Sequence, residues 1–363
     1  MKIGILTFHC AHNYGAVLQA YALQKYLIGL GHNVEIINII PSFLQGYSKN
    51  AWLKCIAIRH PYISLKNLYN ESKIFKMRKK RWQAFDSFIN NELYLSKEQN
   101  IIPDKYDVYI VGSDQVWNSK ITKGLFPPYF CCFPFSKGKR VYLSYAASME
   151  SMQLSNSEKE QYSHLLKNFD YIGVREKELI NIIAPLTEKK VYHTIDPTLL
   201  LDNNTWNNLA SSPIVKGKYV LLYRVWNDLN SRNIANSWAK ENGAKVIELV
   251  SWLDPKTNNN LFQAASPLQF VTLFKYADYV ITDSFHGTSF SIIFKKDFYF
   301  IKVNDSQNRS ESLLSSLCIS DRIINKEDRP IFNHINYAKV MDKLAALKCE
   351  SQQYLQKALY SKS

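Results

Sequence analysis

Short apolar runs alternate with amphipathic stretches at the start of the chain. Residues 3–8 form an apolar run, a polar turn follows, and apolar residues then recur at helical spacing over residues 16–30, up to Gly31. This pattern predicts a strand and then a one-sided helix ended by a glycine that tolerates positive φ. Residues 34–40 predict the next strand. Strand, helix and strand in this order are typical of a parallel sheet.

Four further apolar runs end in polar residues. They cover residues 108–111, 141–143, 171–174 and 191–195. In open parallel sheets, ligands bind beyond the carboxyl ends of the strands. The polar residues that follow these runs are therefore the first candidates for function.

A second alternation of apolar runs and helical stretches begins near Lys218. It predicts strands at 219–223, 245–250, 279–281 and 298–303, and helices at 231–241 and 267–276. The chain has 363 residues, more than one hydrophobic core usually supports. The stretch 203–217, rich in Asn, Ser, Pro and Gly, predicts the boundary. We therefore expect an N-terminal domain over 1–205, a C-terminal domain over 206–335 and a helical tail over 336–363.

A basic segment lies within residues 41–105, a stretch of irregular pattern that we expect to be helical. Residues 73–82 carry six Lys and Arg side chains and lead into Phe85, Phe88 and Ile89 on one helical face. Such a segment fits an anionic membrane surface or an anionic substrate. The solvated face of an amphipathic helix has the same pattern and is the more common case.

The overall charge narrows the choice of partners. Lys and Arg number 45 against 31 Asp and Glu, a formal net charge of +14. This excess favours nucleic acid, an anionic membrane surface or an anionic small substrate. We expect no nucleic acid, because no such motif occurs and the basic residues are spread along the chain. Aromatic residues make up 13% of the chain, which suits contact with sugar rings, although compositional bias gives the same figure.

Cysteine and histidine spacing predicts neither disulfides nor a metal site. The six cysteines form no CxxC pair and no regular framework, so we expect a reduced, cytosolic chain. No two histidines have ligand spacing on a helix beside a carboxylate. No run of 18 apolar residues occurs, and the first apolar run is too short for a signal peptide.

Two polar turns follow predicted strands in the first domain. His12, Asn13 and Gly15 lie where backbone N–H groups at a helix start would face an anion, although the same residues fit a capped tight turn. Ser113 and Asp114 follow a buried strand. Asp114 would hold a sugar hydroxyl or orient a catalytic group; helix capping is the alternative.

Arg175 and His286 are the other two candidates. Arg175 directly follows a buried strand, where it needs a phosphate, a carboxylate ligand or an internal partner such as Glu176 or Glu178. His286 follows the strand at 279–281 and is suited to general acid–base chemistry. We expect Gly287 to open a helix over 290–294, which would give a second anion site.

These stretches together resemble the polysaccharide pyruvyl transferase family. The resemblance spans about residues 3–325 and is carried by Asn13 to Leu23, Val111 to Asn118, Ser144 to Ser148, Val174 to Glu178, Asp196 to Leu200, Thr282 to Gly287 and Asn308 to Ser310. It implies an α/β fold of two Rossmann-like domains in a GT-B-like arrangement with a cleft between them. It also implies transfer of a pyruvyl group from phosphoenolpyruvate, a co-substrate with no further cofactor, to two hydroxyls of one sugar residue during exopolysaccharide, capsule or cell-wall glycan synthesis.

The resemblance assigns roles to the candidate residues. It implies catalysis by His286, which we expect Asp114 to assist. The donor site is expected to use Arg175, Arg309, Ser284, Gly287 and Thr288. The acceptor side or its loops are expected to use His12, Asn13, Gly15, Ser113, Trp117 and Ser144. We expect a saccharide acceptor, including a lipid-linked one, and a cytoplasmic protein with peripheral contact at the inner face of the membrane.

Ser284 departs from the pattern of the family. Many members carry Arg two positions before the catalytic His, so another cation must hold the donor phosphate here. Arg309 is the first choice, ahead of Lys302, Arg224 and Lys295. Two alternatives stay open: a GT-B-type glycosyltransferase that uses a nucleotide-sugar donor, and a non-catalytic glycan-binding relative.

Overall fold

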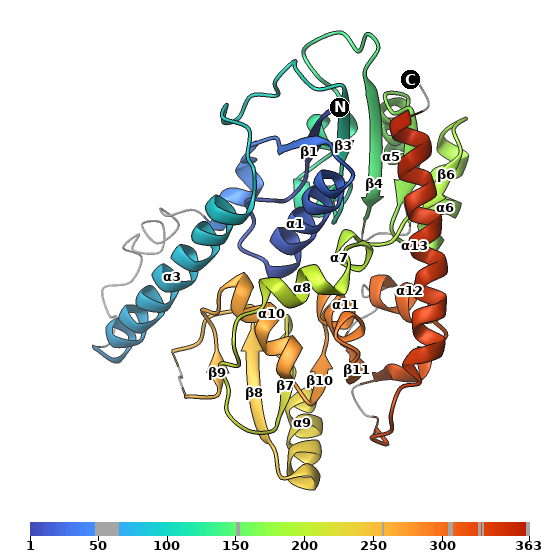
Figure 1. Ribbon diagram of the computed structural model, residues 1–363. Helices are drawn as coiled ribbons and strands as arrows, with labels where there is room; N and C mark the ends of the chain where they lie inside the picture. Colours follow the sequence, from blue (N-terminus) through green and yellow to red (C-terminus); the bar gives the residue numbers. More distant parts are fainter. Residues whose placement is uncertain are drawn as a thin grey trace.

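The protein is built on two parallel β-sheets of six strands each (Figure 1). The computed structural model describes residues 1–47, 65–149, 153–255, 258–303, 308–325, 328 and 330–360. The first sheet has the order β2-β1-β3-β4-β5-β6, and the second β12-β11-β10-β7-β8-β9. Of the segment 41–105 that we expected to be helical, residues 48–64 lie outside the described residues, as do the last three residues of the tail.

The strands of the first sheet are β1 (Lys2–Leu6), β2 (Asn33–Ile36), β3 (Val108–Val111), β4 (Val141–Ala147), β5 (Tyr171–Val174) and β6 (Val191–His193). Those of the second are β7 (Tyr219–Arg224), β8 (Lys245–Val250), β9 (Leu261–Phe262), β10 (Tyr279–Thr282), β11 (Asp297–Lys302) and β12 (Ile323–Asn325). Ten of these strands confirm the prediction; β9 and β12 were missed because two or three residues carry too little pattern.

The helices of the first domain are α1 (Tyr14–Gly29), α3 (Leu65–Glu92), α4 (Ser119–Thr122), α5 (Asn156–Leu166), α6 (Lys177–Ile183), α7 (Pro197–Leu200) and α8 (Asn203–Leu209). Those that follow are α9 (Leu229–Asn242), α10 (Pro267–Tyr276), α11 (Phe285–Ile293), α12 (Asn308–Ser316) and α13 (Tyr337–Tyr360). Short 3-10 turns lie at Ser42–Tyr47, Pro127–Phe130, Ala184–Leu186 and Ser320–Arg322. No helix in the described part of the chain is both long enough and apolar enough to cross a bilayer.

The central strands are apolar on both faces. Every residue of β3, β4, β7 and β10 is buried. Parallel sheets are covered by helices on both sides, so their strands read as continuous apolar runs rather than as an alternation. This is why short apolar runs in the sequence correctly predicted the positions of these strands.

The two domains share an apolar interface. Tyr14 at the start of α1 stacks on Phe270 of α10 with ring centroids 4.8 Å apart, and its hydroxyl donates to the carbonyl of Ala265 at 2.9 Å. Trp206 of α8 packs edge-on against Phe290 of α11 at 4.9 Å. A continuous hydrophobic cluster therefore crosses from one domain to the other, and it fixes how their sheet edges face each other.

The C-terminal helix α13 returns to the first domain. It runs along the side of the molecule past both domains (Figure 1). The Tyr354 hydroxyl donates to the carbonyl of Ser144 in β4 at 2.6 Å, and Ser351 accepts from the backbone N–H of Ile195 at 3.0 Å. The helical tail expected from the sequence is thus part of the first domain's core.

Replacing Leu355 with alanine should test this packing. Leu355 is fully buried on α13, so its truncation should lower the free energy of unfolding by about 2–5 kcal/mol. Urea denaturation of the full chain measures the change. Gln356→Ala, on the exposed side of the same helix, is the matched control and should stay within about 0.5 kcal/mol of wild type. Equal, small losses in both variants would contradict the packing.

Candidate active site between the domains

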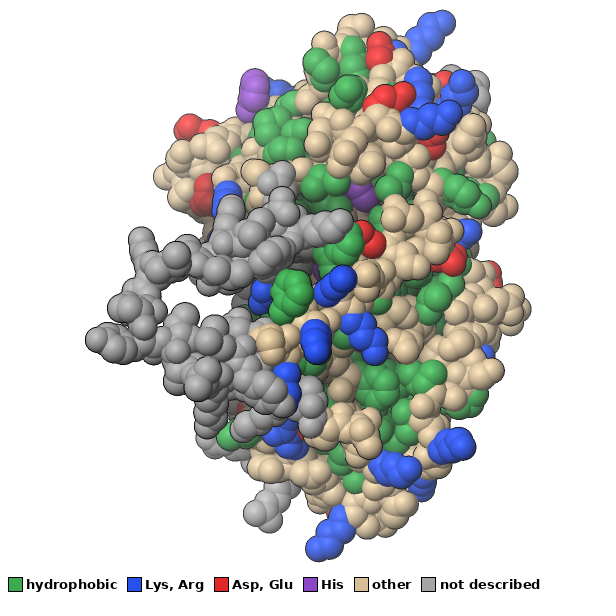
Figure 2. Space-filling model, turned by 90° about the vertical axis from the view of Figure 1, so that its left-hand side faces the viewer, with side chains coloured by type: hydrophobic (Ala, Val, Ile, Leu, Met, Phe, Trp, Pro, Cys, Tyr) green, Lys and Arg blue, Asp and Glu red, His purple; other side chains and the backbone are tan. Residues whose placement is uncertain are grey.

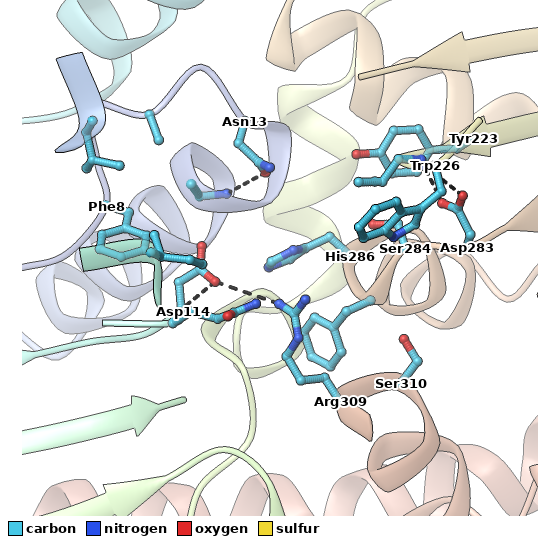
Figure 3. Close-up of a pocket in the computed structure, with 17 residues that line it drawn as sticks. Phe8, Asn13, Asp114, Tyr223, Trp226, Asp283, Ser284, His286, Arg309 and Ser310 are labelled. Atoms are coloured by element: carbon cyan, nitrogen blue, oxygen red, sulfur yellow. Dashed lines mark hydrogen bonds and ion pairs between the residues drawn. The ribbon is translucent and has the colours of Figure 1, made fainter. Parts of the chain in front are cut away.

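A cavity lies where both sheets reverse their strand order. β1 has β2 on one side and β3 on the other, and β7 is flanked in the same way by β8 and β10. Ligands of open α/β sheets bind at such switch points, beyond the carboxyl ends of the strands. Here the two switch points face each other and enclose a cavity of about 340 Å³ (Figure 3).

Side chains from both domains line this cavity. The first domain contributes Phe8, Ala11, Asn13, Ala16, Leu44, Asp114, Gln115 and Ile121. The second contributes Tyr223, Val225, Trp226, Asp283, Ser284, Phe285, His286, Arg309 and Ser310. Of the thirteen residues predicted for the site, five reach the cavity: Asn13, Asp114, Ser284, His286 and Arg309.

His286 lies on the first turn of α11, not in the turn before it. Ser284 caps this helix: its backbone is extended, and its hydroxyl accepts from the N–H of Gly287 at 3.4 Å. The expectation that Gly287 opens the helix is therefore wrong. Ser is a strong N-cap, and it starts the helix at Phe285. The N–H of Thr288 donates to the Ser284 carbonyl at 2.9 Å, so Gly287 and Thr288 both use their N–H groups within the helix.

Gly15 makes room for the His286 ring. A Cβ placed on Gly15 would lie 1.9 Å from Nδ1 of His286, so no larger residue fits there without movement. Gly15 belongs to the first turn of α1, which Asn13 caps by accepting from the N–H groups of Gly15 and Ala16 at 2.9 and 3.3 Å. The role of Gly15 is thus close contact across the domain interface, where it holds one side of the imidazole.

Asp196 lies on the other side of the imidazole. Its Oδ2 is 3.6 Å from Nε2 of His286, and its side chain is fully buried. Thr198 fixes Oδ1 through its N–H at 3.0 Å and its hydroxyl at 2.7 Å. Burial alone would raise the pKa of Asp196, but the adjacent His286 and Arg175 outweigh burial and hold this pKa below its usual range. Asp196 is therefore an ionised partner for His286.

Sequence reasoning did not assign a site role to Asp196. The residue lies in the Asp196-Pro197-Thr198 stretch, 90 positions before His286, and the pattern alone gives the carboxylate no partner. The usable signal was its place directly after the sixth apolar run, at the same sheet edge as Ser113. The Ser113 hydroxyl in fact lies 3.2 Å from Oδ2 of Asp196.

Arg175 is buried behind this pair and does not line the cavity. Its Nη1 donates to Asp196 at 2.8 Å and its Nε to Glu176 at 3.0 Å, while its guanidinium lies over the Phe285 ring at 4.5 Å. Nη2 lies 3.8 Å from a carboxylate oxygen of Asp114. Of the two expectations for Arg175, the structure contains the internal ion pair, with Asp196 and Glu176 as partners. A direct contact between Arg175 and a donor stays a prediction.

Arg309 enters the cavity from the start of α12. One terminal nitrogen lies 4.0 Å from Oδ1 of Asp114 across the cleft (Figure 3). The other cations considered for this role pair elsewhere: Lys302 with Glu311 at 2.7 Å, and Arg224 with Glu248 at 2.8 Å. Lys295 is exposed beyond the far end of α11. The geometry therefore favours Arg309 among the four.

Asp283 is a second carboxylate in the cavity wall, and it was not singled out from the sequence. Its two oxygens accept from the N–H groups of Val225 and Trp226 at 2.7 and 2.9 Å (Figure 3). Burial raises the pKa of Asp283 to about 7, although these two N–H groups favour the charged form. Asp283 thereby connects the loop after β7 to the start of α11, which the next residue, Ser284, caps.

The residues expected on the acceptor side mostly lie outside the cavity. His12 stacks on Phe85 of α3 at 5.3 Å, and burial together with the Arg81 charge lowers its pKa to about 4. Trp117 is buried against Phe130, and the Ser144 hydroxyl donates to Gly173 within the sheet at 3.2 Å.

Aromatic side chains from both domains line the cavity instead. Phe8 follows β1, Tyr223 and Trp226 lie at and just beyond the end of β7, and Phe285 begins α11. Trp226 is 47% exposed.

Among the described residues, no group of three or more His, Cys, Asp or Glu is arranged to hold a metal ion.

The contact between Gly15 and His286 predicts a measurable coupling. Gly15→Ala should lower the free energy of unfolding by about 1–3 kcal/mol, because the added methyl overlaps the ring. His286→Ala removes that overlap, so Gly15→Ala should cost at least about 1 kcal/mol less in the His286→Ala background. Urea denaturation of the four proteins gives the coupling energy. Additive losses would show that the two residues do not touch.

Comparison with solved structures gives distant likenesses. UDP-GlcNAc 2-epimerase from Methanocaldococcus jannaschii has a TM-score of 0.48 at 13% identity, covering 99% of this chain and 100% of that one. The Neisseria meningitidis enzyme, bound to UDP-GlcNAc, has a TM-score of 0.47 at 12% identity, covering 99% and 94%. MurG from Acinetobacter baumannii has a TM-score of 0.37 at 10% identity, covering 99% and 95%. Likenesses this distant say nothing about which reaction this chain catalyses.

The sequence itself gives the decisive comparison. No curated protein matches the chain significantly. The family model for polysaccharide pyruvyl transferase matches residues 13–305, which include His286, Asp196, Asp114 and the starts of α1 and α11 at the cavity. This span covers most of both domains, and it agrees with the resemblance noted in the motifs. The chain therefore belongs to the polysaccharide pyruvyl transferase family.

Proposed function

We propose that this transferase moves a pyruvyl group from phosphoenolpyruvate to two hydroxyls of one sugar residue, with His286 as the general acid and base. One observation carries the proposal: His286 lines the cavity between the domains while Gly15 and the ionised Asp196 hold its ring. A carboxylate behind an imidazole orients the ring and stabilises its protonated form. The family implies a saccharide acceptor.

The cavity suits a donor with several negative charges. Asn13 and Ser284 cap α1 and α11, Ser310 lies in the first turn of α12, and all three residues line the cavity. Three helix N-termini therefore point at one volume, and each favours an anion. Arg309 adds a full positive charge. Phosphate and carboxylate on one small molecule fit this arrangement.

The reaction needs a proton donor and then a proton acceptor. Protonation of the methylene carbon makes C2 of the donor electrophilic, and one sugar hydroxyl adds to it. The C2–O bond to phosphate then breaks, and a neighbouring hydroxyl closes the ketal. One proton ends on the new methyl group and one on the released phosphate or solvent. We assign these proton transfers to His286. We assign to the cavity carboxylates Asp114 and Asp283 the binding of the sugar hydroxyls.

A lipid-linked acceptor at the inner face of the membrane would suit a chain with a net charge of +14, because such a surface attracts basic proteins.

Removing His286 should abolish most turnover without unfolding the protein. His286→Ala should lower kcat for ketal formation by about 10²- to 10⁴-fold, because the general acid and base is lost. Phosphate release from phosphoenolpyruvate in the presence of a panel of glycan acceptors, with ketal detected by NMR, measures this. His164→Ala, on an exposed position of α5, is the control and should behave as wild type. Wild-type turnover in His286→Ala would refute the assignment.

Donor identity is tested by ligand stabilisation. Phosphoenolpyruvate should raise the melting temperature of wild type more than a UDP-sugar at equal concentration, because the ligand binds only the folded state. Arg309→Ala should lose most of this shift, since it removes the cation at the cavity. Lys295→Ala should keep it, because Lys295 is exposed away from the cavity. Stabilisation by the nucleotide sugar alone would favour the glycosyltransferase alternative.

A further inference from the structure

Helix α3 has two parts, which we call the anchored half (residues 81–92) and the projecting half (residues 65–80). In Figure 1 its C-terminal end joins the body of the first domain, while its N-terminal end extends away from both domains. Phe85, Phe88 and Ile89 are buried in the core at the anchored end. The N-terminal end carries the basic segment noted in the sequence.

The anchored half of α3 touches both domains beside the active site. Arg81 donates to the carbonyl of His12 at 3.3 Å and to that of Ser251 at 2.6 Å. His12 adjoins Asn13, the cap of α1, and Ser251 directly follows β8 in the second domain. The same helix therefore links the projecting half to residues that lie beside the cleft that holds His286.

The solvent side of the projecting half is a basic and apolar stripe, which we define as Phe75, Lys76, Lys79 and Lys80. These residues are exposed and share one helical face by their spacing. Phe75 is 41% exposed. Residues 72–81 contain six Lys and Arg and no Asp or Glu, so no acidic neighbour within this segment neutralises the stripe. Figure 2 views the side from which α3 projects, and Lys and Arg side chains gather there next to hydrophobic surface.

We propose that this stripe docks the protein on an anionic lipid bilayer. A helix that combines lysines with an exposed aromatic lies in the interface plane, with the ring in the headgroup region and the ammonium groups near lipid phosphates. Lysine attraction to such a surface acts within about 10 Å, which suits a projecting helix rather than a charge in the body of the protein. Docking here brings the cleft to the membrane surface, where a lipid-linked acceptor is within reach.

The test is binding of the full chain to lipid vesicles. Wild type should sediment at low salt with phosphatidylglycerol–phosphatidylcholine vesicles and not with pure phosphatidylcholine. The triple variant Lys76→Glu, Lys79→Glu and Lys80→Glu should bind the anionic vesicles about 100-fold more weakly, because each lysine contributes about five-fold. Phe75→Ser should weaken the binding that persists at high salt, since it removes the apolar contact.

A matched control separates docking from general charge. Lys216, Lys218 and Lys245 are exposed at the start of β7 and β8, the sheet edge opposite the cleft. Changing these three to Glu alters the net charge equally and should leave vesicle binding near wild type. The proposal is overturned if wild type ignores anionic vesicles, or if both triple variants lose binding alike. Circular dichroism melting confirms that each variant is folded. Because no donor is used, vesicle binding is independent of whether phosphoenolpyruvate is the donor.

Discussion

The close approach of two helix starts at the domain interface is the constraint on which the site depends. Gly15 in the first turn of α1 and His286 in the first turn of α11 touch across the cleft, and a single methyl group would separate them. This contact is fixed because the apolar interface around Tyr14 and Phe270 holds the two sheets edge to edge. The histidine is therefore held by both domains at once, although it belongs to only one.

Buried charge is arranged around this contact in two layers. Asp196 lies beside His286, and Arg175 lies behind Asp196 with Glu176 as its other partner. A buried carboxylate between an arginine and a histidine stays ionised, so it is able to stabilise a positive imidazolium. Arg309 and Asp114 form the outer layer, at the cavity itself. The inner charges orient the histidine, while the outer ones are placed to meet a ligand.

In the second domain, two segments that line the same cavity are joined by hydrogen bonds. Asp283 accepts from two N–H groups of the loop after β7, and the next residue, Ser284, caps the helix of His286. The loop that carries Trp226 is therefore tied to the helix that carries His286. A serine at position 284 serves this cap with its hydroxyl, which explains locally why a short polar side chain fits there.

The sequence alone predicted ten of the strands, the two-domain plan and His286 as a candidate, because strands buried on both faces read as apolar runs and place polar residues at one sheet edge. It also singled out Arg309 and Asp114. Only the tertiary structure decided which of these residues contact each other. Asp196 and Gly15 are 90 and 271 positions from His286, and their contacts with it follow from strand order and domain packing. Arg175 shows the same limit: the sequence predicted Glu176 or Glu178 as its internal partner, and the fold pairs it with Glu176 and also with the distant Asp196.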